Sequence, residues 1–265
     1  MPLKDLDHRP WPPPASPWVM TQTWYNLLFA HWPIPAEAMR ALVPPQLELD
    51  TFDGQAWVGV VPFGMARVYP RGTLPVPWLS RFLEMNVRTY VTLGGKAGVY
   101  FFSLDAANSA AVALARLFFR LPYYHARMRM KSRGGWIEYS SYRIHPGATP
   151  AEFEGRYRPM GPVYGSQPGS LDAWLTERYC LYTVSARGRV YRGEIHHPRW
   201  PLQAAEADIK TNTMALAAGL RLPDTPPLLH FARSLTTWEW LISRVDRERA
   251  PGQTTPDRAQ PSARP

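Results

Sequence analysis

A short part of the sequence places side chains capable of acid–base chemistry and anion binding at alternate positions. Glu84, Asn86 and Arg88 follow one another at every second residue, and Ser103 and Asp105 do the same shortly afterwards. Because the side chains of a strand alternate between the two faces of a sheet, each set shares one face if both segments are strands. A carboxylate can transfer a proton or anchor a ligand, and a guanidinium binds a carboxylate through two parallel hydrogen bonds.

A predicted hairpin brings the two polar sets together. Gly95-Lys96 suits a two-residue type II′ turn, in which the glycine takes a positive φ. In that register Arg88 lies opposite Ser103, and Asn86 lies opposite Asp105. Aromatic and aliphatic residues surround the polar positions, so both faces of the hairpin are expected to be covered. We therefore predict that all five polar side chains point into one cavity of a curved antiparallel sheet.

Two structural interpretations of the same residues stay open beside a site. The polar positions can belong to an ordinary strand that faces solvent, although the surrounding apolar residues argue against this. Glu84, Arg88 and Asp105 can instead form a buried, satisfied ion network that fixes the sheet. The secondary candidates have similar alternatives: His31 can be a hydrogen-bonded residue at a strand end, and Glu177-Arg178 an ion pair at a helix end.

The elements expected around this hairpin indicate an α+β fold that is mainly antiparallel β. Many short segments of high β propensity are separated by turn signals, and the helical segments do not alternate with them. Strands are predicted at residues 20–32, 47–49, 56–61 with an extension to 69, 126–131, 136–144, 179–186, 189–196 and 228–245. About four helices are predicted, at residues 35–43, 108–120, 171–178 and 203–220. Residues 145–169 are expected to be loop with some extended structure.

Length and composition fit a globular protein of one large β-rich domain or two small ones, and no linker is visible that would divide residues 18–246. Of its 265 residues 45% are hydrophobic and 19% charged, and no run of about 18 apolar residues predicts a transmembrane helix. We expect a proline-rich, disordered leader over residues 1–17, one domain over 18–246 and a disordered tail over 247–265. The leader has no apolar segment typical of a signal peptide, and Cys180 is the only cysteine, so a cytoplasmic location is expected.

The net charge of +9 is compatible with nucleic-acid binding, but the pattern of the basic residues argues against it. They are mostly arginines scattered along the chain, without a basic block interleaved with aromatic residues. Metal binding is not indicated either, because the adjacent His196 and His197 point to opposite faces of a strand. Phosphate-binding loops and nucleophile elbows are absent from the sequence. We expect no cofactor, no metal, and no nucleic-acid or membrane partner.

Six sequence segments in the chain form, in combination, a pattern specific enough to compare with a known family. They are residues 29–33 (FAHWP), 53–59 (DGQAWVG), 82–90 (FLEMNVRTY), 99–105 (VYFFSLD), 171–179 (LDAWLTERY) and 197–203 (HPRWPLQ). Together they resemble the YqjF-like family of uncharacterised proteins, DUF2071, over residues 20–245. The resemblance implies a fold similar to acetoacetate decarboxylase, with curved antiparallel sheets rolled into a cone or barrel around a central pocket. It implies no activity.

The resemblance to acetoacetate decarboxylase also implies a difference in chemistry. That enzyme has a proline followed by two lysines, one of which forms a Schiff base with the keto acid. The matching segment here is Leu121-Pro122-Tyr123-Tyr124, so tyrosines replace both lysines, and Glu84 is the counterpart of an upstream pocket glutamate. None of the four lysines lies where apolar surroundings would lower its pKa. They are Lys4, Lys96, Lys131 and Lys210.

We therefore expect a pocket for a small, organic acid-like molecule that works without a Schiff-base lysine. The catalytic candidates are Glu84 and Tyr123, and the ligand-binding candidates are Asn86, Arg88, Ser103, Asp105, Tyr124 and His31. Whether a reaction is catalysed, and whether the chain forms a homo-oligomer, stay open. The alternative is a non-enzymatic ligand-binding or protein-interaction module. In it the polar hairpin residues form a structural ion network, and tryptophans such as Trp238 and Trp240 bind a partner instead of packing in the core.

Overall fold

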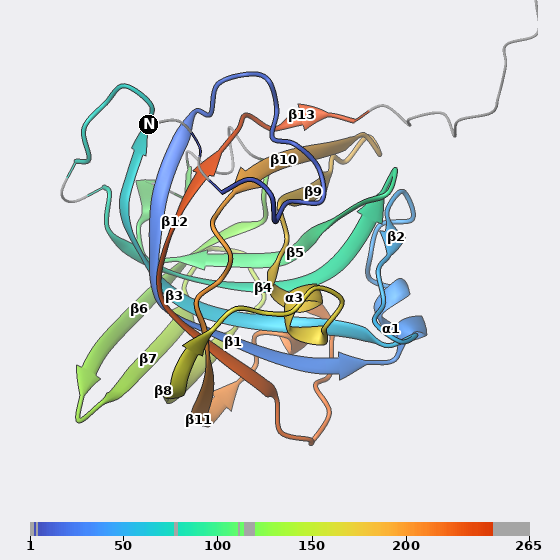
Figure 1. The fold of residues 1–265 in the computed structure, drawn as a ribbon. Coiled ribbons are helices and arrows are strands. Elements are labelled where there is room, and N and C mark those ends of the chain that lie inside the picture. Colours follow the sequence, from blue (N-terminus) through green and yellow to red (C-terminus); the bar gives the residue numbers. More distant parts are fainter. Residues whose placement is uncertain (1–2, 4, 77–78, 111, 114–119, 246–265) are drawn as a thin grey trace, which may run out of the picture.

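The computed structural model describes residues 3, 5–76, 79–110, 112–113 and 120–245, and it joins their strands into one sheet of thirteen (Figure 1). The strands are β1 (Met20–Ile34), β2 (Glu48–Leu49), β3 (Ala56–Pro70), β4 (Phe82–Leu93), β5 (Lys96–Ala106), β6 (Tyr123–Arg133), β7 (Trp136–Arg143), β8 (Glu152–Tyr164), β9 (Cys180–Val184), β10 (Val190–His196), β11 (Leu202–Asn212), β12 (Leu228–Glu239) and β13 (Ser243–Arg244). Their order is β13-β10-β9-β5-β6-β7-β8-β11-β12-β1-β3-β4-β2. Additional pairings of β4 with β5 and of β10 with β12 close the sheet into a ring.

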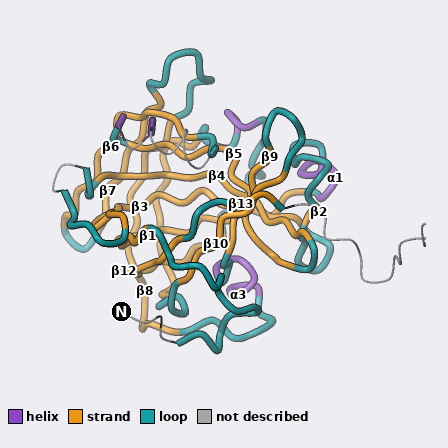
Figure 2. The backbone as a smooth tube through the Cα atoms, turned by 90° about the horizontal axis from the view of Figure 1, so that it is seen from above, coloured by secondary structure: helices purple, strands orange, loops and turns teal. Residues whose placement is uncertain are grey.

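The sheet is mainly antiparallel, as the sequence predicts. Strand β5 is the exception: β4 pairs with it along one edge, and on the other edge it pairs in parallel with β9 at residues 99–100 and with β6 at residues 104–106. The two α-helices whose bounds lie within the described residues, α1 (Ala36–Arg40) and α3 (Leu171–Thr176), are short, and a separate 3₁₀ turn lies at Leu216–Ala218. Both helices lie at the periphery of the strands (Figure 2). The prediction of about four helices is not matched, and the helix predicted at residues 108–120 falls largely outside the described residues.

Residues 203–212 form strand β11, so the helix predicted over 203–220 is wrong. Strand β11 pairs antiparallel with β8, a segment predicted to be mostly loop. Exposed Glu206 and Asp208 reach across to Arg158 and Arg156 of β8, at 2.6 and 3.2 Å. The alanine-rich composition favours a helix, but pairing with the neighbouring strand overrides this weak intrinsic preference.

The β4–β5 hairpin differs from the prediction at its turn. Gly94 and Gly95 are the two central residues, with φ of 59° and 74°, so the turn is type I′ instead of a type II′ turn at Gly95-Lys96. As a consequence Arg88 pairs with Phe101 and not with Ser103.

A β-bulge then changes which face each residue of β5 takes. The register shifts by one residue next to Arg88, so Asn86 pairs with Leu104, while Met85 pairs with Asp105. Because a shift of one residue moves every following side chain to the other face, Ser103 and Asp105 lie on the face opposite Asn86. The prediction of one polar face is therefore wrong for these two residues.

Both faces of the sheet are covered where β1, β3 and β4 meet. One core cluster includes Leu28 and Val60, which are fully buried. A second cluster lies on the other face and includes Phe29 and Val61, their neighbours in sequence. Alternate side chains of β1 and β3 thus enter two different cores. Polar side chains of β4 that lie among them are kept away from bulk water.

Residues 5–17 run along β10 and are placed by specific contacts. Arg9 is buried, lies 3.5 Å from the carboxylate of Glu194, and donates to the carbonyl of Ile195 at 2.6 Å. Trp11 Nε1 donates to Glu194 at 2.9 Å. The disorder of the leader and the division into domains stay predictions, and these contacts show where described residues of the leader lie. The predicted tail over residues 247–265 lies outside the described residues.

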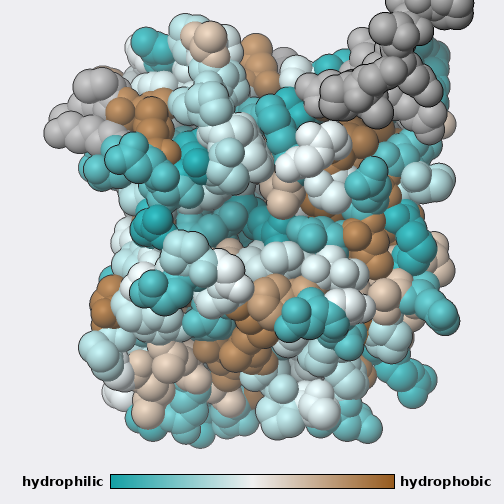
Figure 3. All heavy atoms as spheres, turned by 45° about the vertical axis from the view of Figure 1, so that its right-hand side comes forward, coloured by the Kyte–Doolittle hydropathy of each residue, from teal (hydrophilic) through white to brown (hydrophobic). Residues whose placement is uncertain are grey.

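The surface is mixed in character. Figure 3 shows one face, on which hydrophilic residues gather across the middle and hydrophobic residues are exposed below them. Within the described part of the chain, no helix is long and apolar enough to cross a membrane. The cytoplasmic location, the absence of a nucleic-acid partner and the oligomeric state stay predictions.

Candidate functional site

A cavity of about 290 Å³ opens between β1, β3, β4 and β5 and the segments around residues 178 and 197. Its wall is mostly apolar, and the polar side chains that border it are few. Such a wall, with a small number of placed polar groups, is typical of sites for small molecules. The polar groups at the wall include Gln22, Glu84, Asn86, Arg88, Arg178 and Glu239.

Glu84 is a buried carboxyl group held by two tyrosines. It lies on β4 next to Phe63 of β3, and its Oε2 accepts a hydrogen bond from Tyr123 Oη at 3.0 Å. The Tyr139 hydroxyl donates to the backbone carbonyl of Glu84 at 2.8 Å and fixes the strand there. Burial raises the pKa of Glu84 to about 8, although the hydrogen bond from Tyr123 acts in the opposite direction. At neutral pH this carboxyl group mainly keeps its proton.

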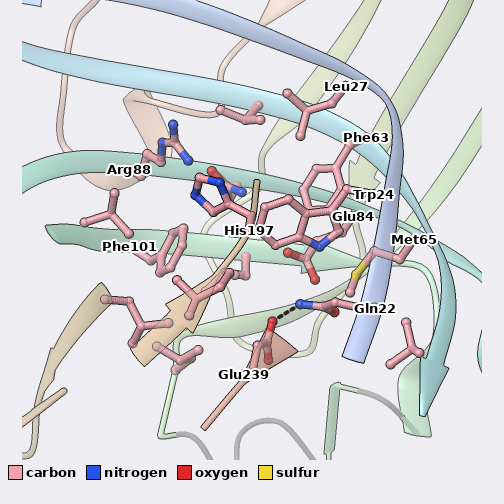
Figure 4. A pocket seen from close by; sticks show the side chains of 18 of the residues that line it. Gln22, Trp24, Leu27, Phe63, Met65, Glu84, Arg88, Phe101, His197 and Glu239 are labelled. Carbon is pink, nitrogen blue, oxygen red and sulfur yellow. Dashed lines mark hydrogen bonds between the residues drawn. The ribbon is translucent and has the colours of Figure 1, made fainter. Parts of the chain in front are cut away.

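Glu239 is a second carboxyl group at the same cavity. It ends β12, and its Oε1 accepts a hydrogen bond from Gln22 Nε2 of β1, drawn as the dashed line in Figure 4. Burial raises the pKa of Glu239 to about 7, and the hydrogen bond from Gln22 opposes this. Proximity of the two negative charges also contributes to the raised pKa of Glu84. The two carboxyl groups therefore share a region of low polarity, in which their hydrogen-bond donors among the described residues are neutral.

Arg88 is a buried guanidinium at the cavity wall without a carboxylate partner. Its Nη2 donates to the Leu175 carbonyl at 3.1 Å and lies 3.5 Å from the Tyr90 hydroxyl. Its Cζ lies 5.1 Å from the centre of the Phe29 ring. No carboxylate lies within ion-pair distance of it among the described residues, and Nε has no hydrogen-bond partner there. The Asn86 Oδ1 atom nearby is likewise buried without a partner in the described part.

His31 lies behind Arg88 and does not border the cavity. Because Tyr90 donates its hydroxyl hydrogen to the Leu175 carbonyl at 2.8 Å, the hydroxyl oxygen accepts from His31 Nε2 at 2.7 Å. Burial, together with the positive charge of Arg88, lowers the pKa of His31 well below its usual value. A neutral His31 thus positions Tyr90, and through it the backbone that holds Arg88.

Besides His31, three of the predicted ligand-binding residues lie away from the cavity. Asp105 forms two hydrogen bonds of 2.7 Å with the guanidinium of Arg143 on β7, and both side chains are buried. The same guanidinium lies 4.1 Å from the centre of the Tyr124 ring. Ser103 is also buried, but it does not border the cavity. The structure therefore brings together Glu84, Asn86, Arg88 and Tyr123 at the cavity. The bulge in β5 turns Ser103 and Asp105 to the other face, and Tyr124 points away because it directly follows Tyr123 on strand β6.

Several residues at the cavity were not anticipated from the sequence. Glu239 lies between two tryptophans in a segment predicted as strand, and a charged residue in such apolar surroundings was a usable signal. Arg178 borders the cavity but pairs with Asp50 at 2.6 Å, instead of forming the helix-end ion pair with Glu177. Glu177 accepts from the backbone N–H of Trp200 at 3.0 Å. No local sequence pattern predicts these contacts between residues that are far apart in sequence.

Lysines and metal-binding clusters are not found at the cavity in the part of the chain that the structure describes. Lys96 lies 5.7 Å from the centre of the Trp11 ring, in the β4–β5 turn. Lys210 is exposed and forms an ion pair with Glu154 at 3.4 Å. Lys131 is exposed on β6, and Lys4 is not among the described residues.

Comparison with known proteins identifies relatives in sequence. The profile of the DUF2071 family, described as an uncharacterized conserved protein, matches residues 21–236. The chain is 46% identical over 231 residues to the uncharacterized protein YqjF of Bacillus subtilis strain 168. That match covers 87% of this chain and 94% of YqjF.

Solved structures of similar fold have low sequence identity to this chain. The enduracididine biosynthesis enzyme MppR, solved with HEPES buffer, has a TM-score of 0.62 at 10% identity, over 88% of this chain and 90% of MppR. Acetoacetate decarboxylase of Legionella pneumophila has a TM-score of 0.57 at 14% identity, over 92% and 95% of the two chains. An acetoacetate decarboxylase-like enzyme of Sphingomonas wittichii RW1 has a TM-score of 0.56 at 13% identity. That match covers 87% of this chain and 94% of the enzyme. The chain therefore belongs to the DUF2071 family and has the fold of acetoacetate decarboxylase-like enzymes.

Proposed function

We propose that the cavity binds a small organic acid whose carboxylate is held by Arg88. The observation that carries this proposal is a buried guanidinium at the wall of a cavity without an anionic partner among the described residues. A buried charge is costly unless it is paired, so an anion supplied by a ligand would complete the site. Arg88 Nε has no hydrogen-bond partner among the described residues, so it can donate a charge-assisted hydrogen bond to a ligand carboxylate.

Glu84 and Tyr123 are proposed to supply the proton chemistry of the site. A carboxyl group with a pKa of about 8 is a proton donor at neutral pH and becomes a base once it is ionised. Burial also raises the pKa of Tyr123 well above its usual value, so its hydroxyl acts as a hydrogen-bond donor and not as a base. MppR, a protein of similar fold, has been solved with pyruvate and with the condensation product of pyruvate and imidazole 4-carboxaldehyde. These complexes support a small carboxylic acid as the class of ligand for this chain.

Imine formation is not part of the proposed chemistry. Tyr123 stands at the position inferred for a lysine, and a hydroxyl group cannot form an imine. An exposed lysine is overwhelmingly protonated at neutral pH, since its pKa is about 10.4. Borohydride reduction in the presence of acetoacetate, followed by intact-mass measurement, should therefore give no stoichiometric adduct. An adduct mapped to a lysine at the cavity would overturn this part of the proposal.

The competing interpretation of a structural ion network receives less support. Asp105 does belong to a buried ion pair, but its partner is Arg143 and the pair lies outside the cavity. Glu84 and Arg88 take part in no carboxylate–guanidinium pair among the described residues. A protein-interaction surface at the tryptophans is also disfavoured, because Trp240 is buried and Trp238 stacks on His196 with ring centres 5.6 Å apart.

The proposal is tested by ligand-induced thermal stabilisation with a panel of small carboxylic acids and their amides. A ligand that binds only the folded state raises the unfolding midpoint. Acids should raise it, and the matched amides should not. Arg88→Gln should weaken acid binding at least about tenfold, since that corresponds to roughly 1.4 kcal/mol of lost interaction. Arg127→Gln, which changes an exposed arginine of β6, is the matched control and should bind like the wild type.

The stability of Arg88→Gln separates a binding effect from misfolding. Because Arg88 compensates no carboxylate in the described residues, its replacement should change the free energy of unfolding in urea by no more than about 1 kcal/mol. If no carboxylic acid stabilises the wild type, or if Arg88→Gln binds acids as tightly, the proposed function is wrong.

A further inference from the structure

The wall of the cavity separates positive from negative groups. Figure 4 shows Arg88 at one side, and Glu84 and Glu239 at the other, with His197 between them. Glu84 and Arg88 are four residues apart on one strand face, which corresponds to a backbone separation of roughly 13 Å. Asn86 and His197 border the space between them, and the other side chains there, such as Leu27, are mostly apolar. A ligand that spans the cavity therefore meets a cation at one end and carboxyl groups at the other.

The described residues place no positive charge at the carboxyl end of the cavity. Among the described residues, Glu84 is contacted by the Tyr123 hydroxyl and Glu239 by the Gln22 amide, and neither carboxyl group has an ion-pair partner. Two carboxyl groups that share a desolvated region repel each other when both are ionised. A cation placed between them would relieve this repulsion and allow both to ionise.

The aromatic residues at this end also suit a cation. Trp24 and Phe63 border the cavity beside Glu84, with ring centres 5.7 Å apart (Figure 4). The face of an indole ring attracts an ammonium group, and more strongly where water is excluded. The volume of about 290 Å³ is at the lower end for ligand sites, so the cation and the anion must belong to one small molecule.

We propose that the ligand is a small zwitterion, whose carboxylate binds Arg88 and whose amine binds between Glu84 and Glu239. The proposal rests on the proposed function, since it assigns the carboxylate to the same arginine, and it adds the group at the opposite end. A linear ω-amino acid has both groups separated by a flexible apolar spacer that matches the apolar middle of the cavity. The bound ammonium would keep Glu84 ionised, as a base close to the amine.

The experiment compares three series of compounds with four to six carbons: ω-amino acids such as 5-aminopentanoate, the corresponding acids such as pentanoate, and the corresponding amines such as pentylamine. Binding is measured by calorimetry at pH 7 in two buffers of different ionisation enthalpy. At least one amino acid should bind ten times more tightly than the acid of equal length. Its binding should release protons, because Glu84 and Glu239 lose them to become carboxylates.

Variants assign each end of the ligand. Glu239→Gln should lower the affinity for the amino acid at least fivefold and leave the affinity for the acid unchanged. Arg88→Gln should lower the affinity for both the amino acid and the acid. Glu138→Gln, an exposed residue of β7, is the matched control and should behave like the wild type. The unfolding midpoint without ligand shows whether each variant is folded.

The outcomes distinguish this inference from the proposed function. The proposal of a zwitterionic ligand is wrong if acids bind as tightly as amino acids of equal length, or if Glu239→Gln lowers the affinity for both classes equally. The proposed carboxylate site at Arg88 stands in either case. If no compound with a carboxylate binds, both proposals fail. Binding of amines alone would also overturn both proposals, because Glu84 and Glu239 would then bind a ligand that makes no carboxylate contact with Arg88.

Discussion

Two buried carboxyl groups, Asp105 and Glu84, lie on paired strands and yet have different surroundings. Asp105 receives two hydrogen bonds of 2.7 Å from the guanidinium of Arg143. Glu84 receives one, of 3.0 Å, from the neutral Tyr123 hydroxyl, and burial raises its pKa to about 8. The first group has the charge compensation that a stable fold requires, whereas the second lacks it at the wall of a cavity. The comparison shows that lack of compensation, and not burial alone, distinguishes a candidate site from a structural ion pair.

The largest expected effect comes from removing the compensation of Asp105. Arg143→Ala should leave a buried carboxylate unpaired and lower the free energy of unfolding by about 3–5 kcal/mol, measured in urea. Replacing both partners by leucine should cost much less than the single change, because no buried charge then remains. A loss below about 1 kcal/mol for Arg143→Ala would show that the pair does not differ from Glu84 in the way described.

The second prediction concerns the pH dependence that Glu84 causes. Its pKa is about 8 in the folded protein against an ordinary value of 4.5. Between these values the unfolded chain has lost the proton and the folded protein keeps it, so stability falls as the pH rises. Glu84→Gln cannot ionise and should lack this part of the decrease, which is at most about 5 kcal/mol. Urea unfolding at pH 5, 6.5 and 8.5 measures the difference.

The stability of Glu84→Gln should still fall somewhat as the pH rises. Glu239 has a raised pKa of about 7, so its ionisation adds a loss of stability between pH 4.5 and 7. The matched control is Glu138→Gln, which should follow the wild-type profile because Glu138 is exposed. Parallel profiles for Glu84→Gln and the wild type would mean that Glu84 is ionised in the folded protein at neutral pH.

The smallest effect is expected from Tyr123→Phe. The hydroxyl of Tyr123 stabilises the ionised form of Glu84, so its removal should raise the pKa of Glu84 further above 8. The cost to stability should be about 1–3 kcal/mol above pH 9, where the carboxylate exists, and smaller at pH 6. Carbon-13 NMR of labelled glutamate side chains follows the titration directly. A lowered pKa would show that Tyr123 acts mainly by excluding water.

Much of the fold was predictable from local signals. The strong β propensity of residues 82–106 and the glycines between the two strands predict the central hairpin, which is confirmed. Ser170 predicts the start of helix α3, where its hydroxyl accepts from the backbone N–H of Ala173 at 3.2 Å. The similarity to acetoacetate decarboxylase-like enzymes is confirmed as well. These features depend on residues that are near one another in sequence, or on a family pattern.

The composition of β11 misled the prediction, although its pattern contains the correct answer. Alanines favour a helix, but Glu206, Asp208 and Lys210 alternate with Ala207 and Ile209 as in a strand with one exposed face. Periodicity should have outweighed propensity here. For a segment that pairs with a distant strand, helix propensity is a weak guide.

The candidate site was predictable only in part, because its composition depends on one bulge. Glu84, Asn86 and Arg88 share a face by strand periodicity alone, and they do border the cavity. The bulge before Ser103 inserts one residue into β5, and no residue type in that strand predicts it. Glu239 reaches the cavity through pairing of β12 with β1 and β10, contacts that span most of the chain.

The contacts of residues 5–17 and of the end of β12 have a practical consequence for protein engineering. A gene trimmed to the family match, residues 21–236, would encode a protein without Arg9 and Glu239. Of its two cationic neighbours among the described residues, Glu194 would keep Arg192, 3.0 Å away, and lose Arg9, and a surface of β10 would be uncovered. The trimmed protein would also lose one of the two carboxyl groups at the cavity. Expression vectors for this family should therefore include the flanking residues, with any affinity tag separated from them by a spacer.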